Sequence, residues 1–196
     1  MDKYQEEMYS FFTHKGNFEN MIKVINHFKN VRETLIQEFW DLVYDKLKEH
    51  VDEHMKGWEV GKDKNYFTRY PGIWIYKKEW GISPIREELP FVVSWESMSI
   101  DPHYGIWFNK DSKVWDISDS KTHIENCKEA RGFKKHLTWA HLVYSELAFS
   151  DKQDLIQILP DAKDDLAKQY SNQLIEIATR FEPRLDEAFK LIVKLK

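Results

Sequence analysis

Two histidines and a glutamate near residue 50 have the spacing of a zinc hydrolase site. His50, Glu53 and His54 fit the pattern H-x-x-E-H, and a helix through them would place both imidazoles on one face. Such a pair can bind Zn²⁺ while the glutamate acts as a general base on a bound water. No downstream residue stands out as the third ligand. The alternative is a solvated, charged helix end, and we expect neither a metal nor a cofactor.

A second pair of residues has the spacing used for RNA cleavage. Arg131 and His136 form an R-x4-H pattern, in which the histidine would act as acid and base and the arginine would stabilise the phosphate. The pattern resembles that of HEPN-type ribonucleases, which carry it on a helix of a helical bundle. Here Gly132 follows the arginine and the chain around it looks partly extended. The alternative is a helix end whose basic residues complement the helix dipole.

A third set of residues imitates the D…(D/E)-x-K arrangement of metal-dependent nucleases. Asp101 and Asp111 would hold Mg²⁺, and Lys113 would orient the attacking water. The expected turn from Asn109 to Ser112 places Asp111 off any strand, which weakens this interpretation. The lone Cys127 permits no intrachain disulfide and is expected to be an inert thiol.

The densest group of distinctive side chains is a cluster of aromatic and basic residues. Exposed rings of this kind can stack on bases or form protein-binding hot spots. The alternative is that the rings fill the space between a sheet and its helices. The residues that we predict to contribute to a binding surface are Tyr66, Arg69, Tyr70, Trp74, Tyr76, Lys78 and Trp80.

Composition and charge favour a soluble protein over a nucleic-acid or membrane protein. The formal net charge is −4, and residues 57–117 carry eight basic and nine acidic side chains, so charge does not support nucleic-acid binding. No apolar run has the length of a membrane span, and the first residues lack the apolar stretch of a signal peptide. We therefore expect a cytoplasmic location.

The elements that must position these residues are two helical blocks around a block of strands. Strands are predicted at 73–80, 91–98, 104–109 and 114–117, with short connections typical of an antiparallel meander. Residues 137–149 fit either a strand or a helix.

Helical spacing extends from 18 to 56, with apolar residues at Met21, Ile25 and Phe28 and onward to Val51. This stretch is long for a small domain, so we expect a break near Asn30 or a protruding helical hairpin, and a short helix or loose arm over residues 1–17. The block 119–196 is mainly helical, and Pro183 should kink or restart its last helix. The predicted fold is a single α+β domain: an antiparallel meander of three to five strands in the block 66–117, packed with a long N-terminal helix and a C-terminal helical pair.

The order of these elements resembles one known arrangement. The sequence GIWIYKKEW is followed by PFVVSWES, HYGIWFN and a capped helical segment. Over residues 31–195 this is similar to the C-terminal, non-catalytic region of PD-(D/E)XK nuclease superfamily proteins of bacterial and phage defence systems. The resemblance implies a companion or specificity module, so no catalytic residue carries over.

We therefore expect a non-enzymatic binding or regulatory module, in a defence or nuclease-associated system, that acts through the aromatic sheet block and the long helix. The expected partner is another protein, with a homodimer through the long helix as one arrangement. The alternative function is a small metal-dependent nuclease or a HEPN-like ribonuclease.

Overall fold

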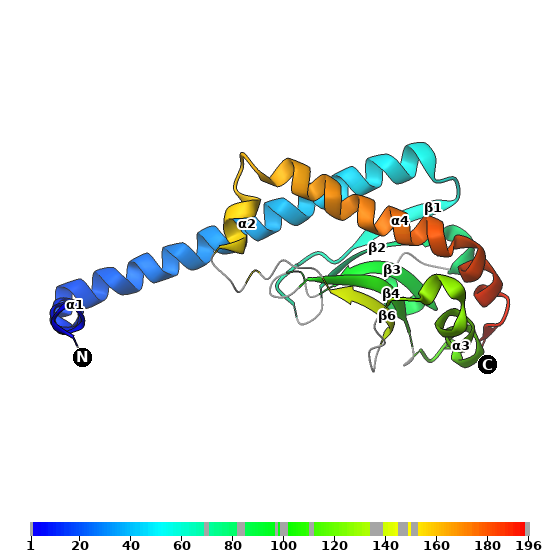
Figure 1. Cartoon of the computed structure of the whole chain (residues 1–196), viewed down its shortest axis with the longest axis horizontal. Helices are drawn as coiled ribbons and strands as arrows, with labels where there is room; N and C mark the ends of the chain where they lie inside the picture. The colour runs from blue at the N-terminus through cyan, green and yellow to red at the C-terminus, as the bar shows by residue number, and fades with distance from the viewer. Residues whose placement is uncertain are drawn as a thin grey trace.

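The computed structural model describes residues 2–68, 71–81, 85–96, 98, 102–109, 112–133, 139–144, 149 and 153–194. Figure 1 shows a body of sheet and helices from which one long helix projects, with the N-terminus at the far end of the projection and the C-terminus on the body. The projection begins with α1 (Lys3–Thr13) and continues into α2 (Lys15–His54). The chain is thus an α+β body with a helical extension, and the predicted fold class is confirmed.

The main sheet has five antiparallel strands in the order β1-β2-β3-β4-β6. The first four pair with their neighbours in the sequence, which confirms the predicted meander. The fifth strand, β6, shows that the ambiguous segment contains a strand. The strands are β1 (Trp58–Lys62), which lies outside the predicted set, β2 (Gly72–Lys77), β3 (Phe91–Glu96), β4 (His103–Phe108) and β6 (Trp139–Tyr144).

Shorter elements complete the body. The first predicted strand stops at Lys77 because residues 78–80 turn into a 3-10 helix. The last predicted strand is real but short, and it pairs with the C-terminal segment in a second, two-stranded sheet. These elements are η1 (Lys78–Trp80), η2 (Arg86–Glu88), β5 (Trp115–Asp116), α3 (Ser118–Asn126), η3 (Lys128–Ala130) and β7 (Val193–Lys194).

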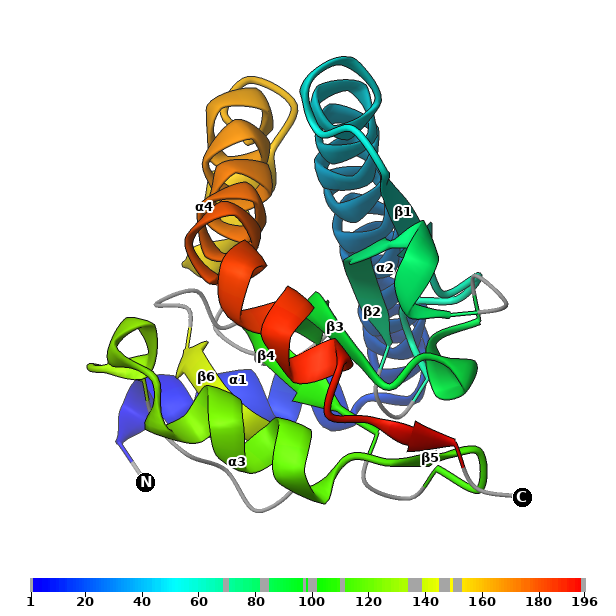
Figure 2. The ribbon, with the colours of Figure 1, turned by 90° about the vertical axis from the view of Figure 1, so that its right-hand side faces the viewer.

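The C-terminal region contains η4 (Asp154–Ile158) and one long helix, α4 (Lys163–Phe189). Pro183 lies inside α4, which continues past it without a restart, and Figure 2 shows the axis of α4 bending toward its C-terminal end. The residues on both sides explain this, because Phe181 and Leu185 are completely buried and hold the two halves of the helix against the body. Packing of the apolar face therefore outweighs the hydrogen bond that the proline cannot donate.

Helices α2 and α4 lie side by side across one face of the sheet, as Figure 2 shows. The rings of Trp95 on β3 and Tyr170 on α4 stack with their centroids 4.5 Å apart. Trp40 on α2 tilts against Trp95 at 5.5 Å and donates its indole N–H to the carbonyl of Met98 at 2.8 Å. Trp95 donates its indole N–H to the carbonyl of Tyr170 at 3.0 Å, so both of these indoles add apolar area while their N–H groups keep a partner.

Helix α2 is one continuous helix of 40 residues that passes through Asn30. The break expected near Asn30 is therefore absent. The short helix expected over residues 1–17 is present as α1, and the extended backbone of His14 separates it from α2. The amide of Asn17 donates to the carbonyl of Phe11 at 2.9 Å and ties the two helices together at this corner. At about 1.5 Å per residue, α2 spans about 60 Å, which exceeds the body that it crosses. The N-terminal half of α2 therefore projects (Figure 1).

Candidate functional site

The three residues of the zinc pattern lie at the C-terminal end of α2, beside the first turns of α4. The rings of His50 and His54 are 4.9 Å apart, and Nε2 of His54 is 3.4 Å from Oε2 of Glu53. They border a shallow hollow with Asp164 and Lys168. Among the residues that the structure describes, no group of three or more His, Cys, Asp or Glu side chains could hold a metal ion. The structure therefore adds no third ligand to this pair.

The two nuclease patterns are only partly covered by the described residues. Arg131 is exposed in a turn after η3 and borders a hollow with Tyr104, Glu176 and Arg180. Lys113 is exposed in a bend before β5. Their predicted partners His136, Asp101 and Asp111 lie outside the described residues, so neither catalytic constellation is assembled from described side chains.

The aromatic cluster belongs to the core and not to the surface. The side chains of Tyr66, Trp74, Tyr76 and Trp80 are all buried, with at most 4% of each residue exposed. The prediction that these four rings form a stacking or binding surface is therefore wrong. Both faces of β2 are covered, so alternation along that strand does not separate an inner from an outer face. Arg69 and Tyr70 lie outside the described residues.

The hydroxyl groups of the two tyrosines are occupied, whereas the indole N–H groups of Trp74 and Trp80 are buried without a hydrogen-bond partner among the described residues. The hydroxyl of Tyr66 donates to Asp41 at 3.0 Å, and the hydroxyl of Tyr76 donates to Glu59 at 2.5 Å. Burial and the adjoining carboxylate raise the pKa of each phenol well above its usual range. Lys78 is the exposed member of the set, and its ammonium lies 3.1 Å from Glu59. These contacts stabilise the body, and they leave few of these phenol, carboxylate and ammonium groups free to bind or react.

A buried ion pair that the sequence does not predict lies across the other face of the sheet. Nη1 of Arg86, from η2, is 2.7 Å from Oε1 of Glu96 on β3, and Glu96 is 1% exposed. The guanidinium lies between the rings of Trp74 and Trp107, at 5.4 and 5.5 Å from their centroids. Burial raises the pKa of Glu96 to about 8, even though Arg86 opposes the shift. The only hint in the sequence is the polar alternation of Ser94 and Glu96 within an apolar strand. The pair holds the segment 85–90 against the sheet.

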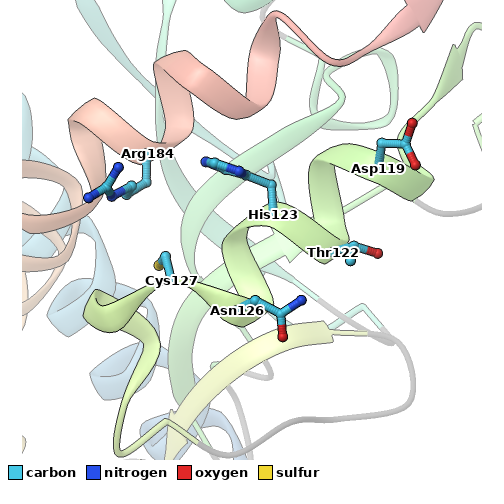
Figure 3. A pocket seen from close by; sticks show the side chains of 6 residues that line it. All are labelled: Asp119, Thr122, His123, Asn126, Cys127 and Arg184. Atoms are coloured by element: carbon cyan, nitrogen blue, oxygen red, sulfur yellow. The ribbon is translucent and has the colours of Figure 1, made fainter.

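A shallow hollow of about 450 Å³ lies between α3 and α4 (Figure 3). Its cationic groups are already compensated, because Glu187 accepts from Arg184 at 2.8 Å and lies 3.2 Å from His123. Arg184 also contacts Glu129 at 3.3 Å. Burial raises the pKa of the Cys127 thiol, and the nearby Glu129 carboxylate adds to the increase. The thiol is therefore held in its unreactive form, and the hollow lacks an activated nucleophile or an uncompensated cation.

The most unusual surface of the molecule is on the projecting helices. We call residues 3–31 the arm, and we call the apolar side chains along its α2 portion the stripe. Most stripe residues are well exposed, for example Val24 at 67% and Ile25 at 53%. Further exposed apolar residues, among them Tyr4, Tyr9 and Phe11, lie on α1. The stripe consists of Phe18, Met21, Ile22, Val24, Ile25, Phe28 and Val31.

The stripe repeats the pattern of the buried face of α2. Eighteen residues make five helical turns, so residues 18 apart point in the same direction. Four stripe residues have a buried counterpart at this interval: Phe18 with Ile36, Met21 with Phe39, Ile22 with Trp40 and Ile25 with Val43. The face that packs on the sheet therefore continues onto the arm, where the described residues do not cover it.

The arm, residues 3–31, contains four basic and three acidic side chains, and the charge is balanced when the residues that border it are included. Residues 2–33 contain five basic and five acidic side chains, so an anionic lipid surface or a nucleic-acid backbone gains no net attraction. A stripe of this size with polar flanks is typical of a protein-binding surface. The charged residues are Lys3, Lys15, Lys23, Lys29 and Arg32 against Asp2, Glu6, Glu7, Glu19 and Glu33.

Comparisons with known proteins add no functional assignment. No family model matches the chain, and neither the curated proteins nor the solved structures contain a significant match. None of the described helices is both long enough and apolar enough to cross a membrane. The resemblance to nuclease-associated regions thus stays a prediction from the sequence.

Proposed function

We propose that the chain is a protein-binding module whose docking element is the arm. The observation that carries this proposal is the stripe, which continues the buried face of α2 beyond the body. Burying a side chain such as Ile25 or Phe28 in an interface contributes about 1.5–3 kcal/mol each, so several together can drive association. The body would then act as a rigid base that holds the arm away from its own core.

The body itself supports binding better than catalysis. Its hollow between α3 and α4 carries compensated charges and a Cys127 thiol with a raised pKa. Its aromatic side chains are used for packing. The chain thus still acts as a binding module, but its binding surface is the long helix and not the aromatic sheet block. The sequence resemblance would make the partner part of a nuclease or defence system, which remains a prediction.

Site-specific photo-crosslinking in cells that carry the chain tests this proposal. A photoreactive amino acid placed at Ile25 lies on the stripe, whereas one at Lys23 lies on the opposite, polar side of the same turn. We expect discrete protein adducts from the Ile25 probe and none from the Lys23 probe. A second substitution on the stripe, Phe18→Asp, should abolish the adducts. Equal adducts from both probes, or none from Ile25, would contradict the proposal.

A further inference from the structure

We propose that the partner of the stripe is the stripe of a second copy of this chain, packed antiparallel about a twofold axis near Lys23 and Val24. This inference rests on the proposed function of the arm and specifies its occupant. Three properties of the arm support it. In an antiparallel pair, apolar residues of one copy lie opposite apolar residues of the other, and basic residues lie opposite acidic ones. The body begins only beyond the overlapping residues.

The apolar residues pair with themselves when the helix is reversed. An axis at position 23 places Phe18 of one copy opposite Phe28 of the other, and Met21 opposite Ile25. Ile22 likewise lies opposite Val24, whereas Val31, at the end of the stripe, lies opposite Lys15. A twofold interface requires this kind of self-complementarity, because every contact occurs twice. Ring pairs of this type contribute beyond the area that they bury.

The charges along one flank of the stripe show the same symmetry. Lys15, Glu19, Lys29 and Glu33 lie on one side of the helix, with the signs plus, minus, plus, minus. Reversal about position 24 places Lys15 opposite Glu33 and Glu19 opposite Lys29, so every pair is attractive. Moving the axis by one residue shifts one helix along the other by two residues, or about 3 Å, which the long lysine and glutamate side chains can span.

The body does not obstruct this arrangement. It begins near Arg32, whose guanidinium donates to the carbonyl of Phe149 at 2.9 Å. Overlap of residues 15–31 therefore places the two bodies at opposite ends of the paired arms.

The apolar area of the stripe approaches the area that a specific dimer buries. Six of the stripe residues are well exposed, and at roughly 80–100 Å² each they present roughly 500–600 Å² of apolar surface per copy. Two copies together would bury roughly 1,000–1,200 Å² of apolar surface, before the polar flanks are added. Specific interfaces bury about 1,200–2,000 Å² in total. The stripe alone thus brings the pair close to this range.

Charge reversal combined with analytical ultracentrifugation tests the inference. The wild-type chain should show a concentration-dependent monomer–dimer equilibrium. Glu19→Lys alone and Lys29→Glu alone should each weaken the dimer roughly 2- to 30-fold, because each creates two like-charged pairs in place of two ion pairs. The double variant Glu19→Lys/Lys29→Glu restores opposite charges across the axis and should recover the wild-type dissociation constant.

The double variant also separates pairing from a loss of helix. Each single change places a like charge four residues away on the same helix, beside Lys15 or Glu33, and the double variant contains both disruptions. If helix loss caused the weakening, the double variant would form the weakest dimer, which would overturn the inference. A wild-type chain that stays monomeric would also overturn it. In that case adducts of the Ile25 probe with a different protein would still support the arm as a docking element.

Discussion

Arg86 and Glu96 form an ion pair of 2.7 Å that is almost completely excluded from water, between a 3-10 helix and the third strand of the sheet. The pair is flanked by two indole rings, and Gly72 leaves the space that the guanidinium occupies. A Cβ atom on Gly72 would lie 2.8 Å from Nη1 of Arg86. With its pKa raised to about 8, the carboxyl carries a charge to pair with the guanidinium above that pH, and a charge removed from water is stable only when it keeps its partner.

Removal of one partner should therefore lower the free energy of unfolding by more than the intact pair contributes to it. We expect Arg86→Met to lower the free energy of unfolding by about 3–5 kcal/mol at pH 9, where Glu96 would remain as an unpaired buried carboxylate. The loss should be smaller at pH 5, because the carboxyl can then take up a proton. Urea denaturation followed by tryptophan fluorescence measures both values. An equal loss at the two pH values would show that Glu96 is not the group left unpaired.

The raised pKa of Glu96 predicts a pH dependence of the wild-type stability. A carboxyl whose pKa rises from 4.5 to about 8 on folding binds its proton more tightly in the folded state. Its contribution is fully present below pH 4.5 and is lost as the pH rises through about 8. The free energy of unfolding should therefore fall across this window in the wild type, with a shallower fall in Glu96→Gln. Parallel pH curves for the two proteins would contradict this prediction.

Two glycines give a matched test of packing against the sheet. A Cβ atom on Gly61 would lie 2.4 Å from the ring of Trp74, whereas a Cβ atom on Gly16 would have no neighbour within 4 Å. Gly61→Ala should destabilise the protein by about 1–3 kcal/mol, because the buried ring must shift. Gly16→Ala lies on a helix and should be neutral or stabilise it by up to about 1 kcal/mol. Thermal unfolding of the two variants distinguishes the effects.

The sequence predicts the parts of this fold that depend on local pattern. Three strands of the meander and both long helices follow from apolar periodicity and turn residues. β1 was missed because Glu59, Gly61 and Lys62 interrupt its apolar pattern with residues that are uncommon in strands. The predicted break near Asn30 was wrong, because α2 continues through this residue, whereas the short helix expected over residues 1–17 is present as α1.

The functional surface is harder to predict than the fold, because burial depends on tertiary contacts. Trp74 and Ile25 are both apolar residues in regular elements, yet one is 4% and the other 53% exposed. Residue type alone assigns the aromatic ring to a binding surface and the isoleucine to the core. The length of the helical stretch is the property of the sequence that indicates exposed apolar residues, because a helix of about 60 Å cannot bury its whole apolar face on one small body.

Cys127 should react slowly with thiol reagents near neutral pH. Burial and the Glu129 carboxylate raise the pKa of the thiol, so little thiolate is present. Glu129→Gln removes the negative charge and should increase the rate of reaction with an aromatic disulfide reagent, measured by absorbance. The comparison should be made at a pH below the ordinary pKa of 9.0. A faster reaction in the wild type than in the variant would contradict this account.

The arm should contribute to association and little to the stability of the body. Phe28 and Ile25 are about half exposed and make no part of the described core, so Phe28→Asp should change the free energy of unfolding of the monomer by no more than about 0.5 kcal/mol. Its buried counterpart on the same helix, Phe39, is the matched control, and Phe39→Ala should cost about 3–5 kcal/mol. Urea denaturation at a concentration where the chain is monomeric measures both. If Phe28→Asp is as destabilising as Phe39→Ala, the arm packs on its own body, and its stripe is not available to a partner.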